Sequence, residues 1–547
     1  MMVLPASSES SRAKTGSLWR VCYWILFAAV FIWAIWQRFS LPLDPLADGD
    51  TWSYLSPALR KLTGAEFGHT NGRNFLYPGF LYLILSVFGD FRAIPFVQHL
   101  LGLMAGVFFL LTWRRLRIFV PKSLVSSSLH DAVGLAGATI YLLATETTRI
   151  ETQLRPEGIC GFLISINLYV IIQVVACCFV ERRRIPALAF GIATVVSSLL
   201  LVSVRPSFGF VVIVALLPIG AFLLQRGWGR EKIVLSAAAA VTAALLFVPE
   251  HFLARNDEIS QTFLPTMLFV IHANLIRDQM AADLRENAKV PYSRDWLECV
   301  HATLSSEIAK SHAADPRRYP LFGFDPEFLW FNESSIAAQL RREFGKNVSG
   351  RCAFYRFYYW RTWQQRPLDE LKKVARQISI YYFPKCPAYT AMKIWPLTDV
   401  YQQGLRSLDF SEYRQTTASL RMAADFMQRT TSLAHTGPVV EQSRLVRLTL
   451  WLLAASNLPW LFLALVLSAI TFWRPAHWNH LRWLGVLVVF GFAYNGGSCL
   501  EVAIVNSLEV YRYMTVQMYA TLLTQLLAFW LILEFVFAIR RQRHGGI

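Results

Sequence analysis

Long apolar runs separated by shorter polar segments dominate the pattern of this chain. The runs occur at about 21–37, 75–90, 94–113, 132–146, 157–180, 186–204, 206–225, 232–249, 446–472, 483–499 and 515–538. An α-helix needs about 20 apolar residues to cross a hydrocarbon core of about 30 Å. A helix also satisfies its own backbone hydrogen bonds inside the bilayer. The pattern therefore predicts an all-α polytopic membrane protein.

Clusters of Arg and Lys indicate which of these runs cross the membrane. Such clusters favour the cytoplasmic side, so neighbouring clusters must be separated by an even number of crossings. The interval between Arg20 and Arg114 contains three runs. We expect 75–90 not to cross, because it is the shortest of the three and contains Pro78 and Gly79. It is predicted to be an interfacial or re-entrant helix on the outer side. About ten transmembrane helices follow, with both termini cytoplasmic.

Three regions are predicted along the chain. Residues 1–249 form an N-terminal membrane region, and its first outer loop covers 37–93. Residues 250–445 break the membrane pattern, because they are rich in charged and aromatic side chains and read as amphipathic helices. This stretch is long enough to fold as a mainly helical extracytoplasmic domain. Residues 446–547 form a C-terminal membrane region.

The composition agrees with a membrane protein and limits the classes of binding partner that we expect. Of 547 residues, 54% are hydrophobic and only 16% are charged, which is unusual for a soluble domain. The net charge of +17 would indicate a nucleic-acid partner in a soluble protein. Here Arg-rich cytoplasmic loops, membrane lipids and phosphate ligands account for it, and no nucleic acid is expected. The chain has no Walker or dinucleotide-binding glycine motif, so nucleotide chemistry has no support.

The eight cysteines do not have the spacing of zinc ligands. Five of them lie in or beside apolar segments, where cysteine is usually a small core residue. Cys299, Cys352 and Cys386 lie in the polar region and could include one disulfide if that region faces an oxidising compartment.

The first candidate for chemistry is an acidic pair just after the first apolar run. Asp48 and Asp50 flank Gly49. Two carboxylates so close together can face one ligand, where one takes a proton from a hydroxyl and the other orients it or holds a divalent cation. The alternative is an ordinary turn, because Asp-Gly is a common turn dipeptide.

Arginines at predicted outer span ends form a second candidate group. They are Arg73, Arg149, Arg155, Arg205 and Arg512. A guanidinium can bind phosphate through paired hydrogen bonds, although an arginine at a span end can also snorkel to lipid headgroups. Several arginines on the outer side oppose the positive-inside bias, which favours a ligand. We rank Arg512 and Arg155 first.

The order of these motifs resembles the GT-C superfamily of integral-membrane glycosyltransferases. The resemblance rests on the acidic pair, on Tyr54 four residues after Asp50, on Tyr77-Pro78 in the next apolar run, on Gln153-Leu154-Arg155-Pro156-Glu157 at the head of a span, and on Glu509-Val510-Tyr511-Arg512-Tyr513 before the last span. It covers the membrane half of the chain and hardly any of 250–445.

The resemblance implies a donor sugar on polyprenyl phosphate and a general base in the first outer loop. That places the base at Asp50 or Asp48, and Asp50 is favoured because it lies closest to the helix expected near Thr51. A direct displacement at the anomeric carbon needs one base on the acceptor and cations on the leaving phosphate. The expected reaction is inverting transfer of a hexosyl or pentosyl group to a glycan, lipid or protein acceptor.

The resemblance also implies acidic residues of the second outer loop that bind metal or acceptor. Glu157 and Glu151 are the candidates, and Mg²⁺ or Mn²⁺ is the cofactor that they could hold, but the Asp-x-Asp pattern is missing there. Glu157 could equally pair with Arg155 or favour the start of the following helix. Tyr54 and His69 are further candidates for contacts with the acceptor.

Two other classes of membrane protein remain open. A polysaccharide polymerase acting on undecaprenyl-diphosphate-linked repeats also needs outer arginines, but it does not require an acidic pair after the first span. A sugar or lipid transporter should carry ionisable groups inside its spans, which are nearly free of them here. We expect a bacterial inner membrane, with the site facing the periplasm or exterior, since Arg540-Arg541-Gln542-Arg543-His544 lacks a dilysine retrieval spacing.

Overall fold

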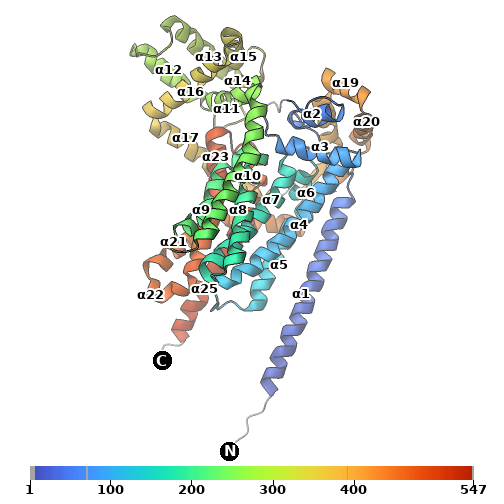
Figure 1. Cartoon of the computed structure of the whole chain (residues 1–547), viewed down its shortest axis with the longest axis vertical. Helices are drawn as coiled ribbons and strands as arrows, with labels where there is room; N and C mark the ends of the chain where they lie inside the picture. The colour runs from blue at the N-terminus through green and yellow to red at the C-terminus, as the bar shows by residue number, and fades with distance from the viewer. Residues whose placement is uncertain (1–6, 69–71, 391, 545–547) are drawn as a thin grey trace, which may run out of the picture.

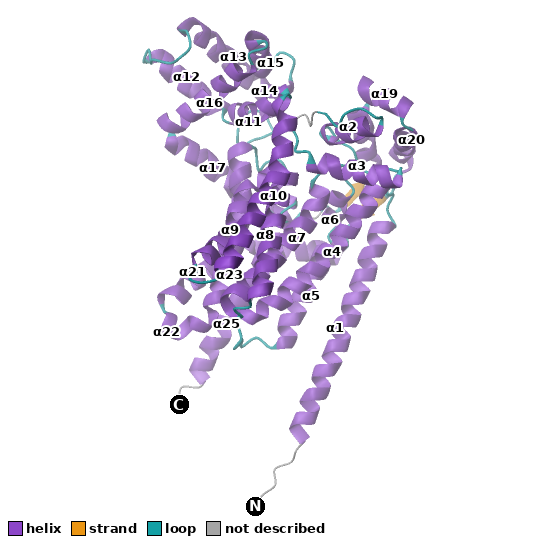
Figure 2. Cartoon of the chain, in the orientation of Figure 1, coloured by secondary structure: helices purple, strands orange, loops and turns teal. Residues whose placement is uncertain are grey.

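The protein folds as a long helical bundle with further helices at one end. The computed structural model describes residues 7–68, 72–390 and 392–544, and helices make up most of them (Figure 2). The predicted all-α polytopic membrane protein is confirmed.

Within these ranges nine helices are long and apolar enough to cross a membrane. They are α1 (Ser7–Phe39), α4 (Ala93–Leu116), α7 (Glu157–Val175), α8 (Arg184–Val204), α9 (Gly209–Leu224), α10 (Gly229–Arg255), α21 (Arg444–Trp473), α23 (Arg482–Val505) and α25 (Met518–His544). Each matches a predicted run. A bent pair, α11 (Glu258–Ile271) and α12 (Ala273–Arg285), would bring the number to ten if it were one span, but its helices meet at 77°.

The predicted span 132–146 corresponds to the shorter helix α5, Ser127–Leu143. Its 17 residues extend about 25 Å at 1.5 Å per residue. It packs in the bundle against α1, α4 and α25. The N-terminal end of α1 and the C-terminal end of α25 lie at the same end of the bundle (Figure 1), so an even number of passes is required. Helix α6 (Thr145–Glu151) follows α5 directly. That α5 supplies the tenth pass stays a prediction.

The run at 75–90 forms α3, Leu76–Phe88, which is too short to cross, as predicted. Gly89 ends α3 with a φ of +63°, and its N–H donates to the carbonyl oxygen of Leu85. Glycine adopts this left-handed conformation without a steric penalty. The helix lies across the end of the bundle beside α2 (Thr51–Leu62) (Figure 1). Together α2 and α3 build the first outer loop.

The region 250–445 contributes to three hydrophobic clusters, and the smallest of them joins Leu46 of the first outer loop to Trp395, Leu397, Tyr401 and Ala434. Helices α11 to α16 bury one of their own, around Ile276, Val300 and Phe354. The later helices pack on the membrane body and the first outer loop, where Phe426 stacks on Phe91 with ring centroids 4.6 Å apart. The helices of this region are α13 (Arg294–Ala314), α14 (Pro326–Phe331), α15 (Ile336–Phe344), α16 (Val348–Gln365), α17 (Pro367–Tyr382), α18 (Leu397–Leu408), α19 (Ser411–Ser419) and α20 (Arg421–Thr436).

Short elements complete the chain. Strands β1 (Ile394–Pro396) and β2 (Val439–Glu441) pair antiparallel. The remaining helical pieces are η1 (Arg117–Phe119), η2 (Ala176–Val180), η3 (Pro206–Phe208), η4 (Pro387–Tyr389), α22 (Pro475–Trp478), η5 (Asn479–Leu481) and α24 (Arg512–Thr515). All eight cysteines are free thiols, so the disulfide considered among Cys299, Cys352 and Cys386 does not form.

Candidate active site

The acidic pair lies in a tight turn that leads into α2. The Asp48 carboxylate accepts a hydrogen bond from the Asp50 backbone N–H at 3.0 Å, and the Asp48 N–H donates to the Thr51 hydroxyl at 2.8 Å. Asp50 precedes the first residue of α2 but makes no capping hydrogen bond with its side chain. Asp48 thus stabilises the turn, and the Asp50 carboxylate is available for other partners.

A short parallel pairing brings the second outer segment to this turn. The N–H of Leu46 donates to the carbonyl oxygen of Thr152 at 2.8 Å, and the N–H of Leu154 donates back to Leu46 at 3.0 Å. Arg155 and Glu157 follow directly, at the start of α7. Two backbone hydrogen bonds therefore align segments that are more than a hundred residues apart in sequence.

Three arginines from distant segments meet at Asp50. Arg73 lies 2.9 Å from one carboxylate oxygen, and Arg512 lies 2.7 Å from the other. Arg155 approaches Asp50 at 3.4 Å and also pairs with Asp48 through its Nε. The structure thus brings together five of the residues predicted for the site.

Glu157 and Arg205 extend the cluster. Their side chains are 3.2 Å apart, and the Nε of Arg512 is 3.9 Å from Glu157. The predicted alternative of a Glu157–Arg155 pair is not observed, because Arg155 faces the aspartates instead. Both Glu157 and Arg205 are buried. A buried carboxylate is tolerated when such a partner compensates its charge.

Aromatic rings position these guanidinium groups. Arg73 lies over the ring of Tyr54 at 5.2 Å, so Tyr54, which was predicted to contact the acceptor, lies beside the cluster. Arg205 and Arg512 lie over Tyr513, at 4.8 Å and 5.3 Å. Such cation–π contacts hold a guanidinium plane while leaving its edge N–H groups available for an anion. Tyr513 was quoted in the motif but not predicted as a site residue.

The electrostatics of the cluster leave Asp50 ionised. Burial raises the pKa of Asp50, but the positive charges of Arg73, Arg512 and Arg155 lower it further, to well below its usual value. Burial raises the pKa of Tyr54 to about 12, so its phenol stays protonated at neutral pH.

The paired groups of the cluster carry a small excess of positive charge. Four arginines (Arg73, Arg155, Arg205 and Arg512) face three carboxylates (Asp48, Asp50 and Glu157). The excess is therefore one positive charge.

The cluster forms the polar end of a cavity of about 370 Å³. Asp50, Arg73 and Arg512 line that end. Phe263 adjoins it, with Arg73 over its ring at 5.2 Å. The rest of the lining is mainly apolar and includes Leu264, Met267, Phe331, Val502 and Val505, together with the carboxylates of Glu327 and Glu501. Leu264 is 51% exposed and Phe331 is 71% exposed, so the apolar end opens at the surface. The sequence pattern gave no sign of this wall, because α11 and α14 resemble other amphipathic helices of the region.

Other predicted residues lie elsewhere. Glu151 is 4% exposed and makes two hydrogen bonds with Arg38 of α1, at 2.8 and 2.9 Å, and a third contact with His99 at 2.8 Å. It joins α1, α4 and α6 and does not line the Asp50 cavity. Arg149 pairs with Glu146, outside the cluster. His69 lies outside the described residues.

The geometry does not resemble a metal centre. The described part of the chain contains no group of three or more His, Cys, Asp or Glu side chains placed to hold a metal ion. Asp48 and Asp50 face guanidinium groups, which compete with a divalent cation for the same oxygens. The arrangement is suited to a carboxylate base next to an anion-binding site.

Comparisons with protein-family models, with curated proteins and with solved structures find no match to this chain.

Proposed function

We propose that this protein transfers a sugar from a polyprenyl-phosphate donor to the hydroxyl group of an acceptor on the extracytoplasmic face of the membrane. The observation that carries the proposal is the contrast within one cavity. An ionised Asp50 and several arginines lie at one end, and an apolar surface lies at the other. A lipid-linked sugar phosphate has the same two chemical halves.

The arginines of the cluster support a donor that carries phosphate. A sugar linked to polyprenyl phosphate is a phosphodiester with a single negative charge. Arg73, Arg205 and Arg512 line the cavity, and their guanidinium groups can donate charge-assisted hydrogen bonds to that phosphate.

The apolar end supports a lipid carrier. Burial of hydrocarbon against Leu264, Phe331 and neighbouring side chains would contribute about 25 cal/mol per Å² of apolar surface. The exposed edge of this wall provides an exit for a chain longer than the cavity. The phosphate then lies next to Arg512 and Arg205, and the sugar lies toward Asp50.

In the proposed reaction the acceptor oxygen attacks the anomeric carbon opposite the phosphate. The hydroxyl proton moves to a carboxylate oxygen of Asp50 as the new C–O bond forms. The bond from the anomeric carbon to the phosphate oxygen breaks, and its electron pair leaves with polyprenyl phosphate. Arg512, Arg205 and Arg73 stabilise the additional negative charge. One displacement inverts the anomeric configuration.

The proposed side of the membrane follows from charge distribution. Asp50 directly precedes α2, which lies at the bundle end away from the N-terminal end of α1 and the C-terminal end of α25 (Figure 1). Arg512 is held against Asp50 at this end. The basic segments Arg114–Arg117 and Arg540–Arg543 belong to the other end. Basic loops favour the cytoplasm, so the site would face outward, in the periplasm of a bacterial inner membrane.

The test is mass spectrometry of polyprenyl-phosphate sugars in membranes of a deletion strain. The strain is restored with wild type, with Asp50→Asn, or with the control Asp295→Asn, which removes an exposed carboxylate of α13. We expect one monophosphate-linked sugar to accumulate in the deletion and the Asp50→Asn strain only. If no such lipid changes, the proposal is wrong, and accumulation of diphosphate-linked repeats would favour the polymerase.

A further inference from the structure

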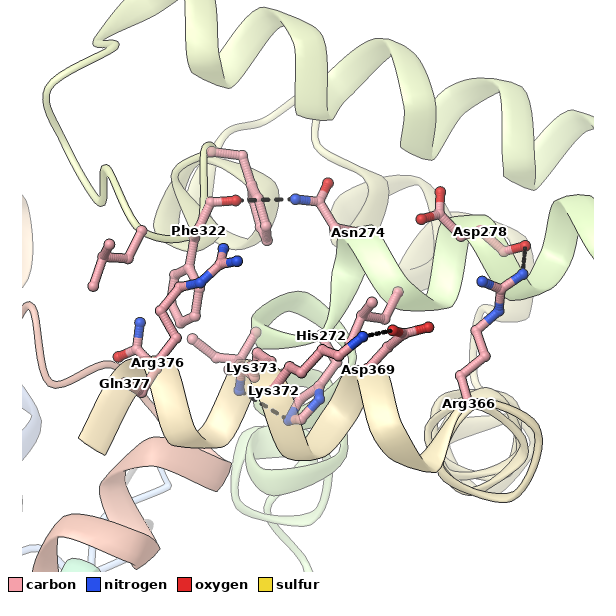
Figure 3. Close-up of a pocket in the computed structure, with 14 residues that line it drawn as sticks. His272, Asn274, Asp278, Phe322, Arg366, Asp369, Lys372, Lys373, Arg376 and Gln377 are labelled. Atoms are coloured by element: carbon pink, nitrogen blue, oxygen red, sulfur yellow. Dashed lines mark hydrogen bonds and ion pairs between the residues drawn. The ribbon is translucent and has the colours of Figure 1, made fainter. Parts of the chain in front are cut away.

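The structure contains a second cavity of about 360 Å³, whose lining residues are drawn in Figure 3. Its volume is within the range of small-molecule sites, about 300–1,000 Å³. Ile271 lines both cavities. Gln377 of the second cavity accepts a hydrogen bond from the Leu508 N–H at 2.9 Å, two residues before Val510 of the first. The two cavities are therefore neighbours that share a wall at Ile271.

The lining of the second cavity is predominantly cationic. Helix α17 contributes Lys372, Lys373 and Arg376, and Arg366 directly precedes it. Two carboxylates, Asp278 and Asp369, also line the cavity. Arg366 donates to the carbonyl oxygen of Asp278, and Lys372 lies 3.5 Å from Asp369.

Arg376 differs from these residues because no hydrogen bond or ion pair to the described residues engages its side chain. Figure 3 shows it extending from α17 toward the segment that carries Phe322. The fold therefore does not require this charge for an internal contact.

Lys373 lies at the inner end of this cavity. Its ammonium donates to the Ala503 carbonyl oxygen at 2.9 Å and contacts His272 Nε2 at 3.2 Å. An ammonium has three N–H donors, so one is available to a ligand. His272 in turn contacts Glu370 at 2.6 Å through its Nδ1. Burial lowers the pKa of Lys373 to about 7, and an anion bound beside it would favour the charged form.

Neutral groups of the cavity fit a saccharide. Asn274 supplies an amide group, and Phe322 and Phe324 supply stacked phenyl rings. The Gln377 amide is already hydrogen-bonded to the segment 507–509 and holds that wall in place. Amides bind sugar hydroxyl groups, and aromatic faces pack against the apolar face of a pyranose ring.

We propose that the second cavity binds an anionic saccharide, with its carboxylate or phosphate held by Arg376 and Lys373. The anion would form charge-assisted hydrogen bonds with both cations. That this saccharide is the acceptor of the transferred sugar rests on the proposed function, because the shared wall at Ile271 would bring one end of it toward Asp50.

The test is isothermal titration calorimetry on the purified full-length protein in detergent, without any donor. Sodium glucuronate is the carboxylate probe, and glucose 1-phosphate is the phosphate probe. We expect one of them to bind, and Arg376→Gln and Lys373→Met each to weaken it about tenfold. Arg356→Gln is the matched control, because Arg356 is an exposed arginine of the same region that does not line the cavity.

One further variant distinguishes binding in the second cavity from binding in the first. Arg512→Gln removes a cation of the Asp50 site and should leave binding of the probe unchanged. The proposal is overturned if neither probe binds, if Arg376→Gln binds as wild type does, or if Arg512→Gln abolishes binding. Arg376 makes no contact that the fold needs, so its loss is not expected to unfold the protein. Because no turnover is measured, this result is independent of the outcome for the donor lipids.

Discussion

Replacement of Asp50 by Asn should have opposite effects on binding and on turnover. In the free protein the Asp50 carboxylate forms ion pairs with Arg512 at 2.7 Å and with Arg73 at 2.9 Å. The donor phosphate needs the same two guanidinium groups. Asparagine has nearly the same shape but no charge. Those guanidinium groups would then be available to the phosphate, while the base would be lost.

The magnitude follows from the charges. A phosphate bound to the same arginines would lie about 6 Å from the Asp50 carboxylate, where two like charges repel by about 2.8 kcal/mol at an effective dielectric constant of about 20. Both side chains of the Arg512–Asp50 pair are 28% exposed, so solvent reduces this value. About 1.4 kcal/mol would tighten binding of polyprenyl phosphate about tenfold. Loss of the base should slow turnover by about 10²–10⁴-fold.

The assay compares the two quantities in the same preparation. Binding of a fluorescent polyprenyl phosphate is titrated in nanodiscs, and transfer is followed by consumption of the donor identified by mass spectrometry. Asp295→Asn should match wild type in both. Weaker lipid binding by Asp50→Asn would refute the competition between carboxylate and phosphate, and normal turnover would refute the role of Asp50 as base.

Three further outcomes follow from single features of the fold. Glu151→Gln should lower the thermal unfolding temperature measured in detergent, because breaking a buried ion pair such as Arg38–Glu151 costs about 3–5 kcal/mol. Phe331→Ser, at a side chain that is 71% exposed, should leave that temperature unchanged but weaken long-chain donors more than short-chain ones in a competition assay. The pH profile of kcat/KM should show no acid limb from Asp50 between about pH 5 and 8. The arginines lower its pKa below the usual 3.8, so the free protein keeps this carboxylate ionised as pH falls through that range.

The membrane body could be predicted because apolar length is a direct requirement of the bilayer. Nine of the ten predicted spans appear as helices of sufficient length, and α3 was recognised as too short. Helix α5 shows the limit of this rule. Its 17 residues fall short of the length of the other spans, but it packs on α1, α4 and α25, and these contacts cannot be read from hydropathy.

The part of the candidate site that the sequence could predict consists of arginines on the outer side of the membrane. Outer arginines such as Arg155 and Arg512 conflict with the positive-inside bias, and they lie beside the acidic pair. The sequence could not show that Glu151 and Glu157 have different roles, because both follow the same outer turn. Only the fold shows that Arg38, at the end of α1, reaches Glu151 and neutralises it inside the protein.

Helices α11 to α20 show why an amphipathic pattern does not predict which part of the protein a helix packs against. A helix with one apolar face must cover something, but the pattern does not say what. Phe354 of α16 packs within the cluster of its own region, whereas Phe426 of α20 stacks on Phe91 of the first outer loop. Next to the acidic turn, the Tyr401 hydroxyl donates to the Asp44 carbonyl oxygen at 2.7 Å, so the region 250–445 helps to hold the turn in place.

The competition for guanidinium groups has a consequence for the order of events in the proposed reaction. Before the donor binds, Asp50 is held by Arg73 and Arg512, and its pKa is too low for efficient removal of a hydroxyl proton. A phosphate that draws these cations away would raise the pKa of Asp50 at the moment when the anomeric carbon arrives. The base is thus active only with the donor in place. An acceptor that binds first, in either cavity, would meet a carboxylate that is still engaged.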